Sequence, residues 1–174
     1  MGAAREPDLD GVVLALAGLR RLELDGHVSE ILSADSRTGA PVMVPAAAQG
    51  ALAVETRDSL DREDPQLAQV LADLDDPATR AAATAERAVL ARLGAGCAAP
   101  VGALARLTVE GGDALRLEAV VAALDGRTVL RESAVGPLSE AQVLGTRVAQ
   151  ALLTAGATRV ADLRAGSVSR KDLR

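Results

Sequence analysis

The stretch VGALARLTVEGGDALRLEAVVAALDGRTVLRESAV, residues 101–135, decides the fold of the C-terminal part of the chain. Three of its runs are rich in apolar residues and typical of strands: residues 101–109, 115–124 and 128–135. Gly111-Gly112-Asp113 indicates a turn after the first run, and Asp125-Gly126 is a two-residue hairpin signal between the second and the third. Because short connections join antiparallel neighbours, the stretch predicts a three-stranded antiparallel sheet.

Helix signals lie on both sides of this predicted sheet. Asp64-Pro65 and Asp76-Pro77 each place an N-cap residue before a proline at the first helical position, and Gly94 follows the second predicted helix. After the sheet, Ser139 and Gln142 form a predicted capping box at the start of a last helix. This order of helices and strands predicts a compact α+β domain.

The N-terminal part carries two shorter apolar runs, residues 11–16 and 51–55. Each is typical of a strand that is buried on both faces, as in a parallel sheet. The charged residues 57–64 indicate a boundary after them. We therefore predict the remnant of a parallel-sheet α/β domain over residues 1–60 and a small C-terminal α+β domain over residues 61–174, so that the fold class is α/β plus α+β.

Composition and charge narrow the classes of function. The chain of 174 residues is 49% hydrophobic and 25% charged, as in a globular protein, and it contains no Phe, Tyr or Trp. Its net charge of -5 argues against a nucleic-acid surface, which needs clustered Lys and Arg. The longest uncharged stretch, residues 39–54, is too short for a membrane span, and prolines interrupt it. A single Cys allows no internal disulfide, and we expect a cytoplasmic protein.

Four residues are candidates for a binding site. Cys97 lies in a loop of small residues, where it is either an inert buried thiol or an open one that could carry an attached group. Arg20 and Arg21 follow the first apolar run and form either a solvated helix face or an anion site at a strand end. Gln49 belongs either to a plain turn or to the rim of a site. The chain shows no spacing typical of a catalytic triad or a metal site.

Three motifs follow one another along the chain. Residues 14–22, LALAGLRRL, form an apolar run that leads into Ala-Gly-Leu and a basic pair, and residues 45–55 read PAAAQGALAVE. Glu86-Arg87 is followed by residues 93–102, LGAGCAAPVG. In this order the motifs resemble the C-terminal half of the porphobilinogen deaminase (hydroxymethylbilane synthase) family. The resemblance covers residues 8–162, nearly the whole chain.

The resemblance implies a transferase. Enzymes of this family condense four porphobilinogen units into the linear tetrapyrrole hydroxymethylbilane and release ammonia, a step of tetrapyrrole and heme biosynthesis. The resemblance implies a dipyrromethane cofactor that is covalently bound through a thioether to Cys97. Arg21 matches an arginine of the family's cleft, and Arg20 and Gln49 are further substrate-cleft candidates. The implied binding partners are porphobilinogen and linear pyrrole intermediates.

Some functions of the family are expected outside this chain. The resemblance places the catalytic aspartate in a domain N-terminal to Met1, so no catalytic residue is assigned here. The chain is expected to be a monomer that depends on this N-terminal portion for activity. The alternative hypothesis is a non-catalytic partner-binding or thiol-carrier module derived from the family's C-terminal domain. The two hypotheses differ in whether Cys97→Ala abolishes function.

Overall fold

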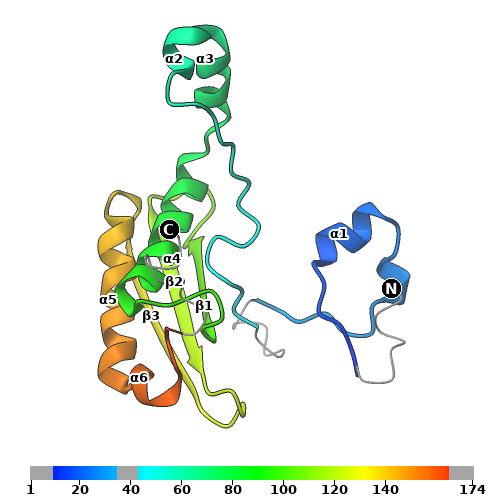
Figure 1. Ribbon diagram of the computed structural model, residues 1–174, viewed down its shortest axis with the longest axis vertical. Coiled ribbons are helices and arrows are strands. Elements are labelled where there is room, and N and C mark those ends of the chain that lie inside the picture. Colours follow the sequence, from blue (N-terminus) through cyan, green and yellow to red (C-terminus); the bar gives the residue numbers. More distant parts are fainter. Residues whose placement is uncertain (1–9, 35–42, 165–174) are drawn as a thin grey trace, which may run out of the picture. The chain divides into compact units, whose positions relative to one another are not determined.

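The computed structural model of the chain describes residues 10–34 and 43–164 and divides into two compact units, Met1–Met43 and Val44–Arg174 (Figure 1). The first unit contains helix α1 (Leu16–Arg21) and the 3-10 helix η2 (Asp25–His27). The second unit contains, in order, α2 (Leu60–Glu63), α3 (Pro65–Leu74), α4 (Pro77–Leu93), β1 (Val101–Leu107), β2 (Ala114–Ala122), β3 (Val129–Pro137), η4 (Leu138–Glu140), α5 (Ala141–Ala155) and α6 (Ala157–Val160). The domain boundary between residues 60 and 61 stays a prediction.

The second unit is built on the predicted three-stranded antiparallel sheet. The strand order is β1-β2-β3, and Leu117 in the central strand pairs with Ala105 on one side and Ala134 on the other. Residues of β2 alternate between buried and more exposed positions, because successive side chains point to opposite faces. The sheet and its flanking helices confirm the α+β part of the predicted fold.

The connection between β2 and β3 is longer than the two-residue hairpin predicted from Asp125-Gly126. Ala122 pairs with Val129, and the Ala123 amide donates a hydrogen bond of 2.8 Å to the Thr128 carbonyl, which leaves residues 124–127 as the loop. Gly126 has a φ of +70°, a conformation that glycine adopts without steric cost. The glycine signal was therefore right about the turn and wrong about its length.

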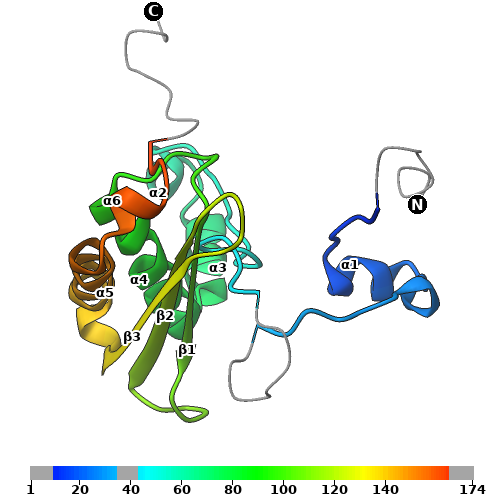
Figure 2. The ribbon, with the colours of Figure 1, turned by 90° about the horizontal axis from the view of Figure 1, so that it is seen from below.

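Helices α4 and α5 pack side by side against one face of the sheet (Figures 1 and 2). The core between these layers is aliphatic, and its largest fully buried side chains are Leu115, Leu117, Leu152, Val89, Val121 and Val148. The two helices approach closely at Gly145, where a Cβ atom would clash with the Ala85 carbonyl oxygen. Burial of each such Val or Leu contributes roughly 1.5–3 kcal/mol, so a core without aromatic rings still holds the domain together.

The ends of the helices follow local sequence chemistry in most cases. The Asp64 carboxylate accepts a hydrogen bond of 3.0 Å from the Leu67 amide, and the Asp76 carboxylate accepts one of 2.8 Å from the Thr79 amide. Gly94 ends α4 in the left-handed conformation, as expected for a residue without Cβ. These predictions are confirmed.

The capping box predicted at Ser139 is wrong. Helix α5 begins at Ala141, its N-cap is Glu140, and no side chain caps it. The 3-10 helix η4 occupies the place of the predicted cap and includes Ser139. A 3-10 turn at the start of a helix replaces a side-chain cap with tighter backbone bonds.

The two strands predicted in the N-terminal part are also wrong for the described structure. Residues 11–15 and 51–57 pair with no strand among the described residues, and α1 begins at Leu16. Their apolar side chains are open to solvent, and Leu52 is 98% exposed. A buried strand needs hydrogen-bonded neighbours, and the described chain offers none to these runs.

Candidate functional site

Cys97 lies on an exposed turn between α4 and β1. The Ala99 amide donates a hydrogen bond of 3.1 Å to the Gly96 carbonyl, which closes a tight turn with Cys97 at its second position. Both ends of the turn are anchored. The Gly96 amide donates to the carbonyl of buried Leu163 at 2.8 Å, and the Pro100 carbonyl accepts from the Ala122 amide at 3.0 Å.

This setting fits a covalently attached group. The Cys97 thiol is exposed, and its neighbours from Gly94 to Ala99 are all Gly or Ala, so no bulky side chain flanks it within the loop. A thiol must be accessible to react, and the anchored ends keep the turn in place when it does. Of the two interpretations of Cys97, the exposed position contradicts the buried thiol, and attachment of a group stays a prediction.

Gln49 is exposed on a second turn, which packs against β1 of the second unit. The Gln49 amide donates a hydrogen bond of 3.1 Å to the Ala46 carbonyl, and Ala48 has a φ of +61°. Before the turn, the Pro45 carbonyl accepts a bond of 2.9 Å from the Ala103 amide at the edge of β1. The turn is therefore attached to the strand that follows the Cys97 loop.

A buried carboxylate holds this turn, and no prediction from the sequence had named its role. Glu86 of α4 is 6% exposed. Its Oε1 accepts a hydrogen bond of 2.7 Å from the Ala105 amide of β1, and its Oε2 accepts one of 2.6 Å from the Ala48 amide. Burial raises the pKa of Glu86 above its usual range, while the two amide donors act in the opposite direction.

The signal that could have found Glu86 is its place in the helical period. Ala85 and Val89 are buried, and Leu93 lies seven residues beyond Glu86, so the carboxylate falls on the apolar stripe of α4. A charged residue at such a position needs hydrogen-bond partners, because an unpaired buried carboxylate is costly. Such a position in a sequence predicts a buried polar contact.

Arg20 and Arg21 form the last turn of α1 and are exposed. Cationic side chains are favourable at this end of a helix, because they interact with the free carbonyl groups there. Both arginines belong to the first unit, whereas Gln49 and Cys97 belong to the second. The predicted site residues are thus divided between the two units, and their assignment to one site stays a prediction.

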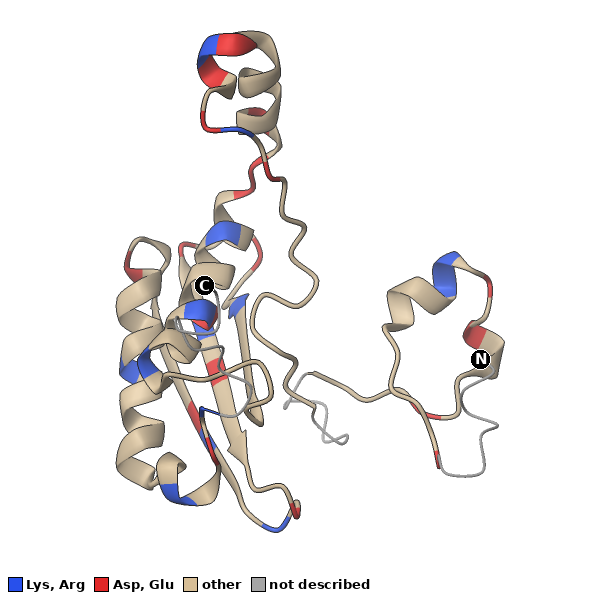
Figure 3. Ribbon diagram, viewed as in Figure 1, with Lys and Arg blue, Asp and Glu red and all other residues tan. Residues whose placement is uncertain are grey.

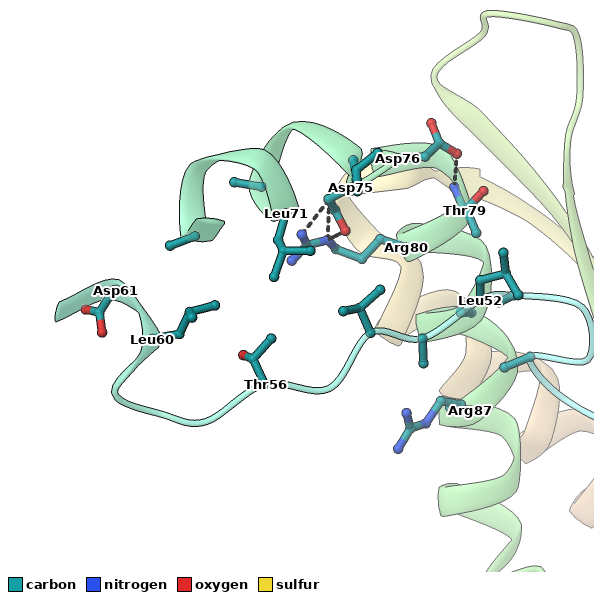
Figure 4. A pocket seen from close by; sticks show the side chains of 18 of the residues that line it. Leu52, Thr56, Leu60, Asp61, Leu71, Asp75, Asp76, Thr79, Arg80 and Arg87 are labelled. Atoms are coloured by element: carbon teal, nitrogen blue, oxygen red, sulfur yellow. Dashed lines mark hydrogen bonds and ion pairs between the residues drawn. The ribbon is translucent and has the colours of Figure 1, made fainter. Parts of the chain in front are cut away.

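A groove with a volume of about 920 Å³ lies in the second unit between residues 48–61 and helices α3 and α4, and Ala48 and Gly50 of the Gln49 turn are among its lining residues. Figure 4 shows it opening between Leu71 and Arg80 on one side and Thr56 and Leu60 on the other. Three arginines and four aspartates line it, and Arg80 is already hydrogen-bonded to Asp75 at 2.9 Å. Its balanced charge does not favour an anionic ligand, and neither Cys97 nor Gln49 lines it.

Among the described residues, neither the distribution of charge (Figure 3) nor that of metal-binding side chains indicates a further site. Acidic and basic residues are interspersed along the described elements (Figure 3). Within residues 10–34 and 43–164, no three His, Cys, Asp or Glu side chains gather where they could hold a metal ion. Among the same residues, no helix has both the length and the apolar character needed to cross a membrane.

Two family models match the chain in succession. Residues 1–65 match the dipyrromethane cofactor binding domain of porphobilinogen deaminase, and residues 80–154 match the porphobilinogen deaminase C-terminal domain. Cys97 lies in the second region, and Gln49 and the two arginines lie in the first. The Glu86–Ala48 hydrogen bond therefore joins the two matched regions.

Individual relatives carry the same description. The porphobilinogen deaminase of Cutibacterium acnes is 49% identical over 174 aligned residues, which cover 94% of this chain and 50% of the relative. That of Mycobacterium avium is 50% identical over 157 residues, covering 86% of this chain and 46% of the relative. That of Roseiflexus castenholzii is 47% identical over 152 residues, covering 87% and 46%. The chain spans about half the length of these relatives.

Proposed function

Because the chain belongs to the porphobilinogen deaminase family, a family of transferases in porphyrin biosynthesis, we propose that it supplies the cofactor-carrying half of a hydroxymethylbilane synthase. The observation that carries this proposal is the Cys97 thiol, exposed on a turn of small residues that is anchored at both ends. The match of residues 1–65 to the dipyrromethane cofactor binding domain supports a cofactor of that kind.

Cys97 is the attachment point in this proposal. Its Sγ bonds to the aminomethyl carbon of a pyrrole, and the amine leaves as ammonia with the proton that the thiol gives up. When bound, dipyrromethane supplies the terminal pyrrole to which porphobilinogen units are added. The covalent tether keeps the growing chain at high effective concentration and prevents its loss between steps.

Arg20, Arg21 and Gln49 bind the pyrrole side chains in this proposal. Each porphobilinogen unit carries an acetate and a propionate group, and a guanidinium fork matches a carboxylate with two parallel hydrogen bonds. The exposed arginines of α1 have such forks available at the end of the helix. The exposed side-chain amide of Gln49 adds a neutral hydrogen-bond donor at the rim of the binding site.

The proposal assigns the condensation reaction to an assembly rather than to this chain alone. The substrates are porphobilinogen and linear pyrrole intermediates. The reaction takes place in the cytoplasm, where the Cys97 thiol stays reduced. The rest of such an enzyme corresponds to the half of the relatives' length that this chain does not span.

A reconstitution assay tests this function. The chain is mixed with a separately expressed N-terminal half of a relative, and porphobilinogen consumption is followed. We expect turnover with the wild-type chain and none with Cys97→Ser, which is nearly isosteric. Association of the halves with equal behaviour of both variants would favour the non-catalytic module instead.

A further inference from the structure

Glu86 is the one buried charged residue among the described part of the chain, and it contacts two segments that are far apart in sequence. One carboxylate oxygen receives the Ala105 amide of β1, and the other receives the Ala48 amide of the turn that carries Gln49. The Ala105 amide lies on the side of β1 that faces away from β2, so Glu86 also satisfies a donor at the sheet edge. A single side chain thus ties a helix, a strand and a turn together.

The same turn is fitted to β1 at a second point. The Pro45 carbonyl accepts the Ala103 amide at 2.9 Å. At Gly102 the approach is so close that a Cβ atom would clash with the Val44 carbonyl oxygen. Residues 44–48 are therefore held against the strand by one direct hydrogen bond, one carboxylate bridge and one glycine that makes room.

The backbone of the Gln49 turn contains a residue in an unfavourable conformation, which contacts from outside the turn must stabilise. Ala48 has a φ of +61°, which a residue with a Cβ atom rarely adopts. The amide that this conformation presents is the one that Glu86 accepts. A strained residue persists where its surroundings hold it, and the hydrogen bond to the Glu86 carboxylate is one of the contacts that hold this turn.

We propose that Glu86 is a positioning residue that holds the Gln49 turn in fixed register with the helix and strand on either side of the Cys97 loop. Glu86 lies in α4, which ends at Leu93, just before that loop, and Ala105 lies in β1, which begins just after it. The inference rests on the proposed function, because the register matters only if the Gln49 turn faces the group carried by Cys97.

A purely structural role makes a different prediction. If Glu86 only stabilised the core, its loss would loosen α4, the sheet and α5 together. A positioning role confines the change to residues 44–50 and to the Ala105 amide, which Glu86 also accepts, and leaves the rest of the domain protected from exchange.

Hydrogen exchange with Glu86→Gln separates these roles, with Glu110→Gln as the matched control in an exposed turn. Glutamine offers one acceptor where glutamate offers two, and its NH2 group faces an amide donor. We expect exchange at the Ala48 amide to accelerate by about tenfold or more, as for loss of a hydrogen bond to a charged group. Uniform acceleration across the domain, or none at Ala48, would overturn the proposal.

Gly102→Ala covers the case in which Glu86→Gln fails to fold. Its methyl group pushes on the Val44 carbonyl while the carboxylate stays intact. We expect the same local acceleration over residues 44–50. Unchanged exchange there in this variant would contradict the close approach of Val44 to Gly102 on which the inference depends.

Two reactions at Cys97, alkylation and cofactor loading, test whether the contact between Glu86 and the Gln49 turn matters for function. Alkylation by a small maleimide reports only exposure of the thiol, and we expect Glu86→Gln to leave its rate unchanged because Leu163 and Ala122 anchor the loop. Cofactor loading of the reconstituted enzyme should fall by about tenfold, in step with the exchange result. Loading equal to wild type, or a parallel fall in alkylation, contradicts a positioning role. If the wild-type chain never takes up the cofactor, the proposed function is refuted. The exchange result still tests whether Glu86 holds the Gln49 turn.

Discussion

Two regions of this chain both contain apolar runs but differ in burial. In β2, Leu115, Leu117, Ala119 and Val121 are fully buried between the sheet and two helices. In residues 51–57, Leu52 and Val54 are largely exposed. The difference lies in the neighbours: β2 pairs on both sides, whereas residues 51–57 pair with no strand among the described residues. Hydrophobicity supplies the driving force for burial, and the available partners decide where burial occurs.

The largest effect is expected in the buried region. Leu117 is completely buried in the central strand, so Leu117→Ala should lower the free energy of unfolding by about 2–5 kcal/mol through lost burial and the cavity left behind. Urea denaturation followed by circular dichroism measures this change. A loss below about 1 kcal/mol would mean that the core is not packed as described.

Substitution of two glycines, one at a close helix contact and one in open space, gives the next largest expected difference in stability. Gly145→Ala places a methyl group against the Ala85 carbonyl and should cost about 1–3 kcal/mol by forcing α4 and α5 apart. Gly18→Ala in α1 has no atom within 4 Å of the added carbon and should leave stability of the second unit unchanged. Thermal melts of the two variants give the contrast, and equal melting temperatures would contradict it.

The dependence of stability on pH compares Glu86 within α4 with Asp76, the N-cap residue before that helix. The pKa of Glu86 is raised in the folded state by burial, so the native state binds more protons than the unfolded one. Stability should therefore fall as the pH rises from the usual glutamate pKa through the raised value. Glu86→Gln should flatten this part of the profile.

Asp76 should give the opposite slope. Hydrogen bonds from Thr79 lower its pKa, so its contribution is present above the usual aspartate pKa and is lost as the pH falls through the lowered value. Asp76→Asn should remove that acid-side slope and leave the Glu86 slope intact. Denaturant midpoints measured across the acid range report both, and slopes of equal sign would contradict the assignment.

The smallest effect is expected in the exposed region. Leu52 is 98% exposed, so Leu52→Ser should change the free energy of unfolding by about 0.5 kcal/mol or less. The same denaturation measurement applies. A cost comparable to that of Leu117→Ala would show that residues 51–57 are buried in solution.

Prediction from the sequence succeeded for local features of the second unit and failed where a strand needed distant partners. Helix starts at Asp64 and Asp76, the end at Gly94 and the antiparallel sheet are local features, and the structure confirms them. The strands predicted at residues 11–16 and 51–55 required partners that no local pattern can guarantee.

The candidate site was predictable to a similar extent. A turn of small residues around Cys97 could be recognised from its composition, whereas the exposure of the thiol was left open and comes from the structure. The helical period predicts a buried polar contact at Glu86, but its two amide partners lie 38 and 19 residues away and emerge only from the fold.

Mass spectrometry of the peptide that bears Cys97 tests the central claim most directly. The chain is purified after reconstitution with the N-terminal half of a relative in the presence of porphobilinogen, then digested and mapped. The account predicts an added mass of two porphobilinogen units less two ammonia on Cys97, and no addition in Cys97→Ser. An unmodified Cys97 in an assembly that consumes porphobilinogen would contradict it.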